Sequence, residues 1–63
     1  MAIKKRQKWE IDIIDSENDR TYTYTIGPTE TPERAMRLAM KEHGEDRVRW
    51  VGNPRPYRSV YKL

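Results

Sequence analysis

The sequence of 63 residues contains no cysteine, and no apolar run in it approaches the roughly 20 residues needed to span a bilayer. The lack of cysteine excludes disulfides, thiolate zinc sites and thiol nucleophiles, and it fits a reducing compartment. The basic residues near the N-terminus are not followed by the apolar segment of a secretory signal. We therefore expect a cytoplasmic protein that has no membrane partner and no covalent cross-link.

The length allows one small domain with a thin core, for which a stability of about 3–5 kcal/mol is typical. Hydrophobic residues make up 35% of the chain and charged residues 37%. The apolar residues recur with the periods of strands and helices, which argues against disorder. We predict a single domain over residues 1–63, with a basic arm at 1–7, a folded core at 8–52 and a basic tail at 53–63.

Positive charge is concentrated at the two ends of the chain. Residues 1–8 carry four positive charges and residues 47–63 carry five, and neither segment has an acid. The residues between them are acidic, with a net charge of −4 over 9–20 and −2 over 21–46. Because the total of +3 is modest, this uneven distribution is the stronger indication of an interaction surface.

Two alternating segments predict a β-hairpin. In residues 8–15 the apolar side chains of Trp9, Ile11 and Ile13 alternate with Glu10 and Asp12, which is typical of a half-buried strand. Residues 21–26 alternate threonine with tyrosine and isoleucine, and their β-branched and aromatic side chains favour a second strand. The polar residues 16–20 between them form the turn.

A helix and a third strand follow the hairpin. Thr31 suits the N-cap, Pro32 the first helical position, and Gly44 the position just after a helix that ends at His43. Residues 46–51 alternate again, so we expect Val48 and Trp50 to face the core. The segment Gly52-Asn53-Pro54 is expected to end this strand, because proline cannot donate to a ladder. The tail at 57–63 forms either a short fourth strand or an irregular end.

These elements predict an α+β fold of the ββαβ type. A right-handed crossover through the helix makes the third strand parallel to the second, so it pairs with the free edge of the first. The result is a three-stranded antiparallel sheet of order 2-1-3, covered on one face by a single helix. The expected core contains seven apolar residues: Trp9, Ile11, Ile13, Leu38, Ala39, Val48 and Trp50.

No combination of residues in the sequence predicts catalysis. Glu10 and Asp12 lie on one strand face, but Arg47 and Arg49 are expected opposite them, and such cross-strand pairs ordinarily stabilise a sheet. His43, the only histidine, is expected to interact with the carbonyl groups at the end of the helix. A metal site needs more ligands than this. We predict that the protein is not an enzyme and has no metal or cofactor.

Basic and aromatic residues remain at both ends of the chain. Because the first strand starts where its antiparallel neighbour, the third strand, finishes, the two basic segments are expected to merge into one patch at one end of the sheet. Such a patch suits the phosphates of DNA or RNA. The predicted binding residues are Lys4, Lys5, Arg6, Lys8, Arg55, Tyr57, Arg58 and Lys62. A protein-binding module is the alternative, and a free edge strand allows either a monomer or a weak homodimer.

The order of strands, the helix segment "ETPERAMRLA" and the later "NPRP" resemble the small RNA-polymerase inhibitor proteins of podophages. The shared positions are Glu30-Thr31, Ala35, Leu38 and Ala39 in the helix, and Arg55-Pro56 after the third strand. The resemblance implies a phage-type or mobile-element protein that binds a host protein such as RNA polymerase. Only Arg55 corresponds to a polymerase-binding arginine, one residue out of register, and this chain is basic where that family is more acidic.

Overall fold

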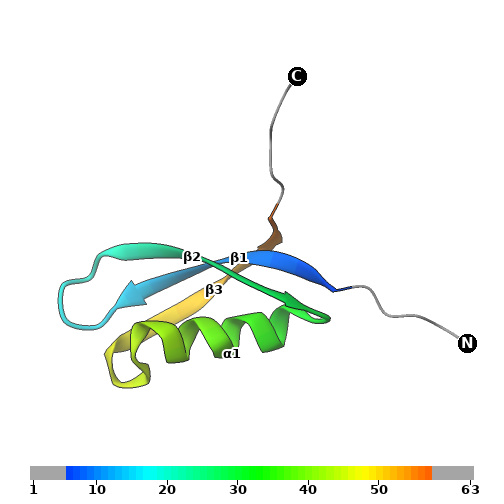
Figure 1. The fold of residues 1–63 in the computed structure, drawn as a ribbon. Coiled ribbons are helices and arrows are strands. Elements are labelled where there is room, and N and C mark those ends of the chain that lie inside the picture. Colours follow the sequence, from blue (N-terminus) through cyan, green and yellow to red (C-terminus); the bar gives the residue numbers. More distant parts are fainter. Residues whose placement is uncertain (1–5, 58–63) are drawn as a thin grey trace, which may run out of the picture.

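The computed structural model describes residues 6–57 and has the predicted ββαβ order (Figure 1). A single α-helix follows two strands, and a short 3₁₀ turn joins it to the third strand. The elements are β1 (Gln7–Asp15), β2 (Thr21–Thr29), α1 (Pro32–His43), the 3₁₀ turn η1 (Glu45–Arg47) and β3 (Val48–Pro56). In this part of the chain, no helix is long and apolar enough to cross a membrane.

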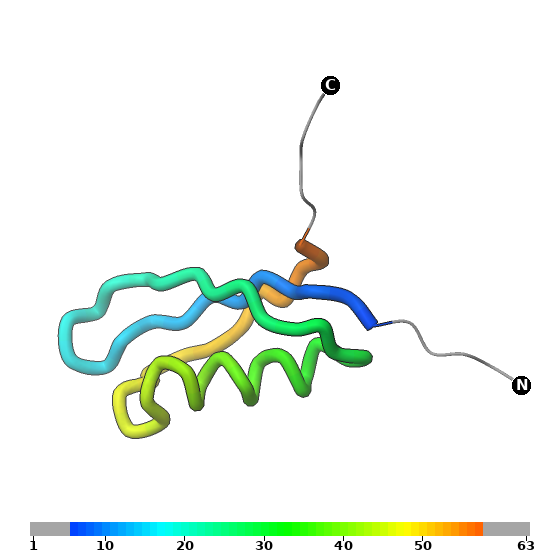
Figure 2. The backbone as a smooth tube through the Cα atoms, viewed as in Figure 1, coloured from blue at the N-terminus to red at the C-terminus, as the bar shows by residue number. Residues whose placement is uncertain are grey.

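The sheet has the order β2-β1-β3, and β1 is antiparallel to both of its neighbours. Helix α1 runs beneath one face of the sheet and leaves the other face open (Figure 2). The α+β fold with the order 2-1-3 is therefore confirmed. The central strand β1 is paired along both of its edges. Strands β2 and β3 each have one edge without a neighbouring strand within residues 6–57.

The core lies between β1 and α1. Ile11 and Ile13 of β1 and Ala35 and Ala39 of α1 are fully buried. The two alanines let the helix approach the sheet closely, because they add almost no side chain between the layers. Larger, partly buried side chains pack around this centre: Trp9, Tyr24, Ile26, Met36, Met40, Val48 and Val51.

Both ends of α1 are capped as the sequence predicts. The Thr31 hydroxyl accepts a hydrogen bond from the Arg34 backbone N–H at 3.2 Å. At the other end, the Gly44 N–H donates to the Met40 carbonyl at 2.9 Å. These caps satisfy backbone groups that have no partner inside the helix.

The third strand does not alternate as predicted, because its pairing with β1 is irregular between Ile14 and Asp15. Asp15 pairs with Val48 and Ile14 pairs with Trp50, so Arg49 is the extra residue of a β-bulge. The bulge shifts the following residues by one position, and Val51 rather than Trp50 packs against the core. The prediction that Trp50 is a core residue is wrong: it lies on the open face and is 43% exposed.

Two further sequence predictions are corrected by the structure. Strand β3 does not end at Gly52 but continues to Pro56, through a second irregularity at Asn53, whose φ of 55° is in the left-handed region that asparagine tolerates. Leu38 is not a core residue, because it is 36% exposed on α1. Ala35, which the predicted core omitted, is one of the four fully buried apolar residues.

Candidate nucleic-acid interface

The start of β1 and the end of β3 lie side by side. The Tyr57 backbone N–H donates a hydrogen bond to the Lys8 carbonyl at 2.9 Å, one step beyond the last strand pair, Trp9 and Pro56. The start of β1 and the residue that follows β3 therefore lie at the same end of the sheet. We call the exposed residues Arg6, Lys8 and Tyr57 at this end the basic end.

Three of the predicted binding residues are exposed at the basic end. Arg6 and Lys8 are exposed, and Tyr57 is 38% exposed. Within residues 6–57, neither Arg6 nor Lys8 takes part in an ion pair, so both charges face solvent. Four other predicted binding residues lie outside the described residues: Lys4, Lys5, Arg58 and Lys62.

Arg55 is held by two acids and is not the free cation that the sequence predicts. Its Nε donates to Glu10 at 3.1 Å, and its two terminal nitrogens each donate to an oxygen of Asp12 at 3.2 Å. The hydrogen bond with Arg55 is the largest influence on Asp12, and it lowers the pKa of that carboxyl from its ordinary value. Arg55 therefore ties β3 to β1 across the open face.

The predicted pairing of Arg47 and Arg49 with Glu10 and Asp12 is wrong. Arg47 instead contacts Asp15 at 3.1 Å, and Arg49 contacts Asp19 at 2.6 Å, both at the hairpin end of the sheet. The reason is the antiparallel pairing of β3 with β1. Arg47 and Arg49, around the start of β3, lie beside the end of β1, whereas Arg55, near the end of β3, lies beside the beginning of β1. The acidic turn is thus partly neutralised at the end of the sheet opposite the basic end.

A buried polar network joins the hairpin turn to the end of α1. Asp15 is fully buried, and its Oδ1 accepts hydrogen bonds from the backbone N–H groups of Glu17 and Asn18 at 2.7 and 3.0 Å. Its Oδ2 lies 2.7 Å from Nε2 of His43. Burial opposes ionisation of Asp15, but these hydrogen bonds and the charge of Arg47 outweigh it and lower its pKa to about 2.

The sequence predicts that His43 interacts with the carbonyl groups at the end of the helix. In the structure its side chain instead links this network to β2. Its Nδ1 lies 2.7 Å from the Tyr24 hydroxyl, and its other nitrogen contacts Asp15. The neutral tautomer with hydrogen on Nε2 satisfies all three groups: Nε2 donates to the carboxylate and Nδ1 accepts from the hydroxyl. Because both ring nitrogens are used and the side chain is only 5% exposed, the network is structural.

The open face carries an aromatic site that the sequence analysis missed. Trp50 borders a cavity of about 480 Å³, which we call the aromatic cleft. Its other lining residues come from all three strands: Asp12, Ile14, Thr21, Arg49 and Asn53. The sequence signal for this site is Gly52, two residues after Trp50 on the same strand. The indole ring of Trp50 occupies the space that a side chain at position 52 would need. A Cβ atom at position 52 would meet Cζ2 of Trp50 at 2.5 Å.

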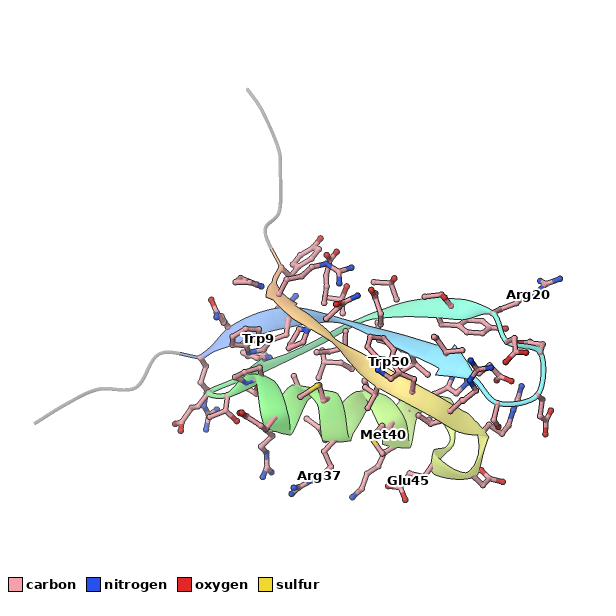
Figure 3. The ribbon with its side chains drawn as sticks, turned by 180° about the vertical axis from the view of Figure 1, so that it is seen from behind. Trp9, Arg20, Arg37, Met40, Glu45 and Trp50 are labelled. Atoms are coloured by element: carbon pink, nitrogen blue, oxygen red, sulfur yellow. The ribbon has the colours of Figure 1, made fainter. Side chains whose placement is uncertain are left out.

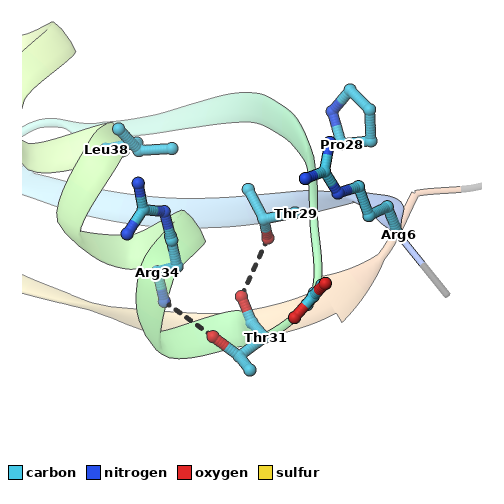
Figure 4. A pocket seen from close by; sticks show the side chains of 7 residues that line it. Arg6, Pro28, Thr29, Thr31, Arg34 and Leu38 are labelled. Atoms are coloured by element: carbon cyan, nitrogen blue, oxygen red, sulfur yellow. Dashed lines mark hydrogen bonds between the residues drawn. The ribbon is translucent and has the colours of Figure 1, made fainter. Parts of the chain in front are cut away.

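A second hollow, of about 450 Å³, lies beside the first turn of α1 (Figure 4). Arg6, just before β1, and Arg34 of α1 border it, and Leu38 forms part of its apolar wall. The Thr29 hydroxyl, which faces this region, donates to the Thr31 carbonyl at 2.9 Å. The acidic Glu30 also lines the hollow, so the charges around it are mixed.

Residues 6–57 bring together no group of three or more histidine, aspartate and glutamate side chains that is suited to hold a metal ion. Comparison of the chain with protein-family models, curated proteins and solved structures gives no match.

Proposed function

We propose that this protein binds DNA or RNA without catalysis and that its basic end contacts the phosphates. The observation that carries the proposal is the hydrogen bond between Tyr57 and Lys8, because it brings an exposed cation at the start of β1 beside an exposed tyrosine at the end of β3. Lysine and arginine side chains that face solvent attract phosphates and release the counterions bound to them. Tyr57 adds an exposed aromatic ring to the same surface.

The pairing of charges on the open face supports phosphate binding at the basic end. Arg47, Arg49 and Arg55 are paired with acids, so little positive charge remains free along β3. Arg6 and Lys8 have no such partner within residues 6–57, and four more cations lie in the adjoining segments of the sequence. Phosphates are therefore drawn to the basic end rather than to the middle of the sheet.

The test is an NMR titration of the isotope-labelled full chain with short DNA and RNA, at about 50 mM and then about 200 mM salt. We expect shifts at Arg6, Lys8 and Tyr57 that weaken as salt rises. The double variant Arg6→Ala/Lys8→Ala should reduce the slope of log affinity against log salt by about 1.4–1.8, since each phosphate contact contributes about 0.7–0.9.

The matched control removes two exposed cations from the helix, in the variant Arg37→Ala/Lys41→Ala. Arg37 extends from α1 away from the sheet (Figure 3). This control has the same net charge as the test variant and should keep the wild-type slope. No binding at low salt, or an equal loss in both variants, contradicts the proposal.

A host protein is the second candidate partner. The observation that favours it is the outer edge of β2, whose backbone groups face no strand within residues 6–57 and offer a template for strand addition. A partner bound there would shift the backbone amides of Thr21–Thr29 and leave Arg6 and Lys8 unaffected. Shifts confined to β2 on addition of RNA polymerase would favour this candidate over nucleic acid.

A further inference from the structure

Trp50 is a large aromatic side chain on the face of the sheet that no helix covers. It pairs across the strands with the half-buried Ile14, and its indole ring lies over Gly52. With 43% of its surface in water, it is the most exposed of the large hydrophobic side chains among residues 6–57. Burial of an exposed tryptophan against a flat partner releases a large area from water, so this position is suited to binding.

The aromatic cleft beside Trp50 has both polar and apolar lining residues, and its two charged side chains are paired. Both oxygens of Asp12 are occupied, because Thr23, Asn53 and the two terminal nitrogens of Arg55 all donate to them. A carboxylate has about four acceptor positions, so Asp12 is saturated. Arg49 is paired with Asp19. A flat, uncharged group fits these surroundings better than a phosphate does.

The aromatic cleft and the basic end lie on one line along β3. Trp50, Gly52 and Arg55 pair with open-face residues of β1, and Tyr57 follows two positions after Arg55. The β1 residues beside Trp50 and Tyr57 are Ile14 and Lys8, which are six positions apart. At about 3.3 Å per residue, Trp50 and Tyr57 are therefore separated by about 20 Å, a span that several nucleotides cover. The cleft volume of about 480 Å³ also falls within the usual range of small-ligand sites.

We propose that the aromatic cleft is a stacking site for a base of single-stranded DNA or RNA, whose phosphates lie on the basic end. This inference rests on the proposed function and adds the class of nucleic acid. A base inside a duplex is already stacked on both sides and is not available to Trp50. Stacking on tryptophan needs only the π-face that every base has, so the site tolerates different sequences.

The test compares a fluorescently labelled oligothymidine of about 12 nucleotides with a duplex of the same length, using the full chain and anisotropy. The single strand should bind more tightly. Trp50→Ala should weaken its binding by about 5- to 150-fold, which corresponds to the loss of one stacked base. Trp50→Phe, which keeps an aromatic face, should stay close to the wild type.

A second measurement uses the unmodified chain and does not depend on the folding of any variant. The indole N–H signals of Trp9 and Trp50 are assigned in the unmodified chain from their nuclear Overhauser contacts with neighbouring residues. On addition of the oligothymidine, the Trp50 signal should move and the Trp9 signal should stay in place, because Trp9 packs against the core. An unmoved Trp50 signal at saturation overturns the inference.

The outcomes separate the two proposals. If Trp50→Ala binds the single strand as well as the wild type while Arg6→Ala/Lys8→Ala binds weakly, the stacking site is wrong and the basic end stands. Equal affinity for single strand and duplex, with no change at Trp50, leads to the same conclusion. If neither nucleic acid binds at low salt, both proposals fail.

Discussion

Two neighbouring residues of β3 offer the sharpest test of the register on which the open face depends. The structure puts Val51 against the core and Trp50 in solvent, whereas simple alternation along residues 46–51 predicts the reverse. A change to glutamine at each position separates the two arrangements, because glutamine is tolerated on a solvated face and costly against a core.

The expected magnitudes differ. Val51→Gln loses a packed side chain, and it forces a polar amide towards Ile13, the fully buried residue opposite. Together these effects cost about 2–4 kcal/mol, which approaches the total of about 3–5 kcal/mol typical of so small a domain. We expect Val51→Gln to be largely unfolded at room temperature.

Trp50→Gln should remain folded. With 43% of the residue already exposed, roughly half of its surface, about 100 Å², leaves water on folding. At roughly 25 cal/mol per Å², this burial is worth about 2.5 kcal/mol, and contacts of the glutamine stem reduce the expected loss to about 1–2 kcal/mol.

Urea unfolding followed by far-ultraviolet circular dichroism measures both losses without depending on tryptophan fluorescence. Thr25→Gln, at an exposed position on β2, controls for the presence of glutamine in a strand. An unfolded Trp50→Gln beside a stable Val51→Gln would refute the bulge at Arg49. It would also remove the aromatic cleft, because Trp50 would then be a core residue.

Two further predictions concern the acids of β1. Asp15 has a folded pKa of about 2, below its unfolded value of 3.8, so its contribution to stability is present above pH 3.8 and is lost as the pH falls towards 2. Circular dichroism of the wild type should show a loss of structure across this range. Asp15→Asn should be less stable at neutral pH and should lose this acid transition, because the carboxyl group that titrates is absent. An unchanged acid transition in the variant would contradict this role of Asp15. Arg55→Met should raise the pKa of Asp12 towards its ordinary value and lower the urea midpoint, because the bonds that favour the carboxylate are lost. Carboxyl NMR titration measures the first effect, and an unaltered Asp12 titration would be inconsistent with the ion pair.

The hairpin, the helix and the strand order follow from local signals in the sequence. Alternation in 8–15 and 21–26, the Thr31-Pro32 start and the Gly44 end each act over a few residues, and the structure confirms all of them. The crossover rule then leaves one place for the third strand, beside β1.

The phase of β3 was not predictable in the same way. The segment Val48-Arg49-Trp50-Val51 offers two apolar sets, Val48 with Trp50 and Val48 with Val51, and local alternation favours the first. The second wins because Val48 and Val51 both pack against the buried centre of the molecule, which holds only two isoleucines and two alanines among residues 6–57. A strand can shift its faces by one residue through a single bulge, and no residue in this segment marks the bulge in advance.

The candidate site depends on these shifts. The prediction that the two basic segments merge required only the strand order, and among residues 6–57 Lys8 and Tyr57 lie side by side. The partners of the arginines depended on register, so Arg55 was expected to be free and is paired. The aromatic cleft depended on the bulge itself, because without it Trp50 would face the helix.

The buried network of Asp15 explains how so small a core is held in place. Asp15 follows Ile11 and Ile13 on the inner face of β1, where a further apolar residue would extend the core. Instead it binds the hairpin turn through two backbone N–H groups, the helix end through His43 and the start of β3 through Arg47. The hairpin turn and the segment that joins α1 to β3, about 25 residues away in the sequence, thus meet at one carboxylate, at the end of the sheet opposite the basic end. Arg47 directly precedes β3 and lies two residues before Arg49, so the network holds the chain at the point where β3 begins, close to the bulge.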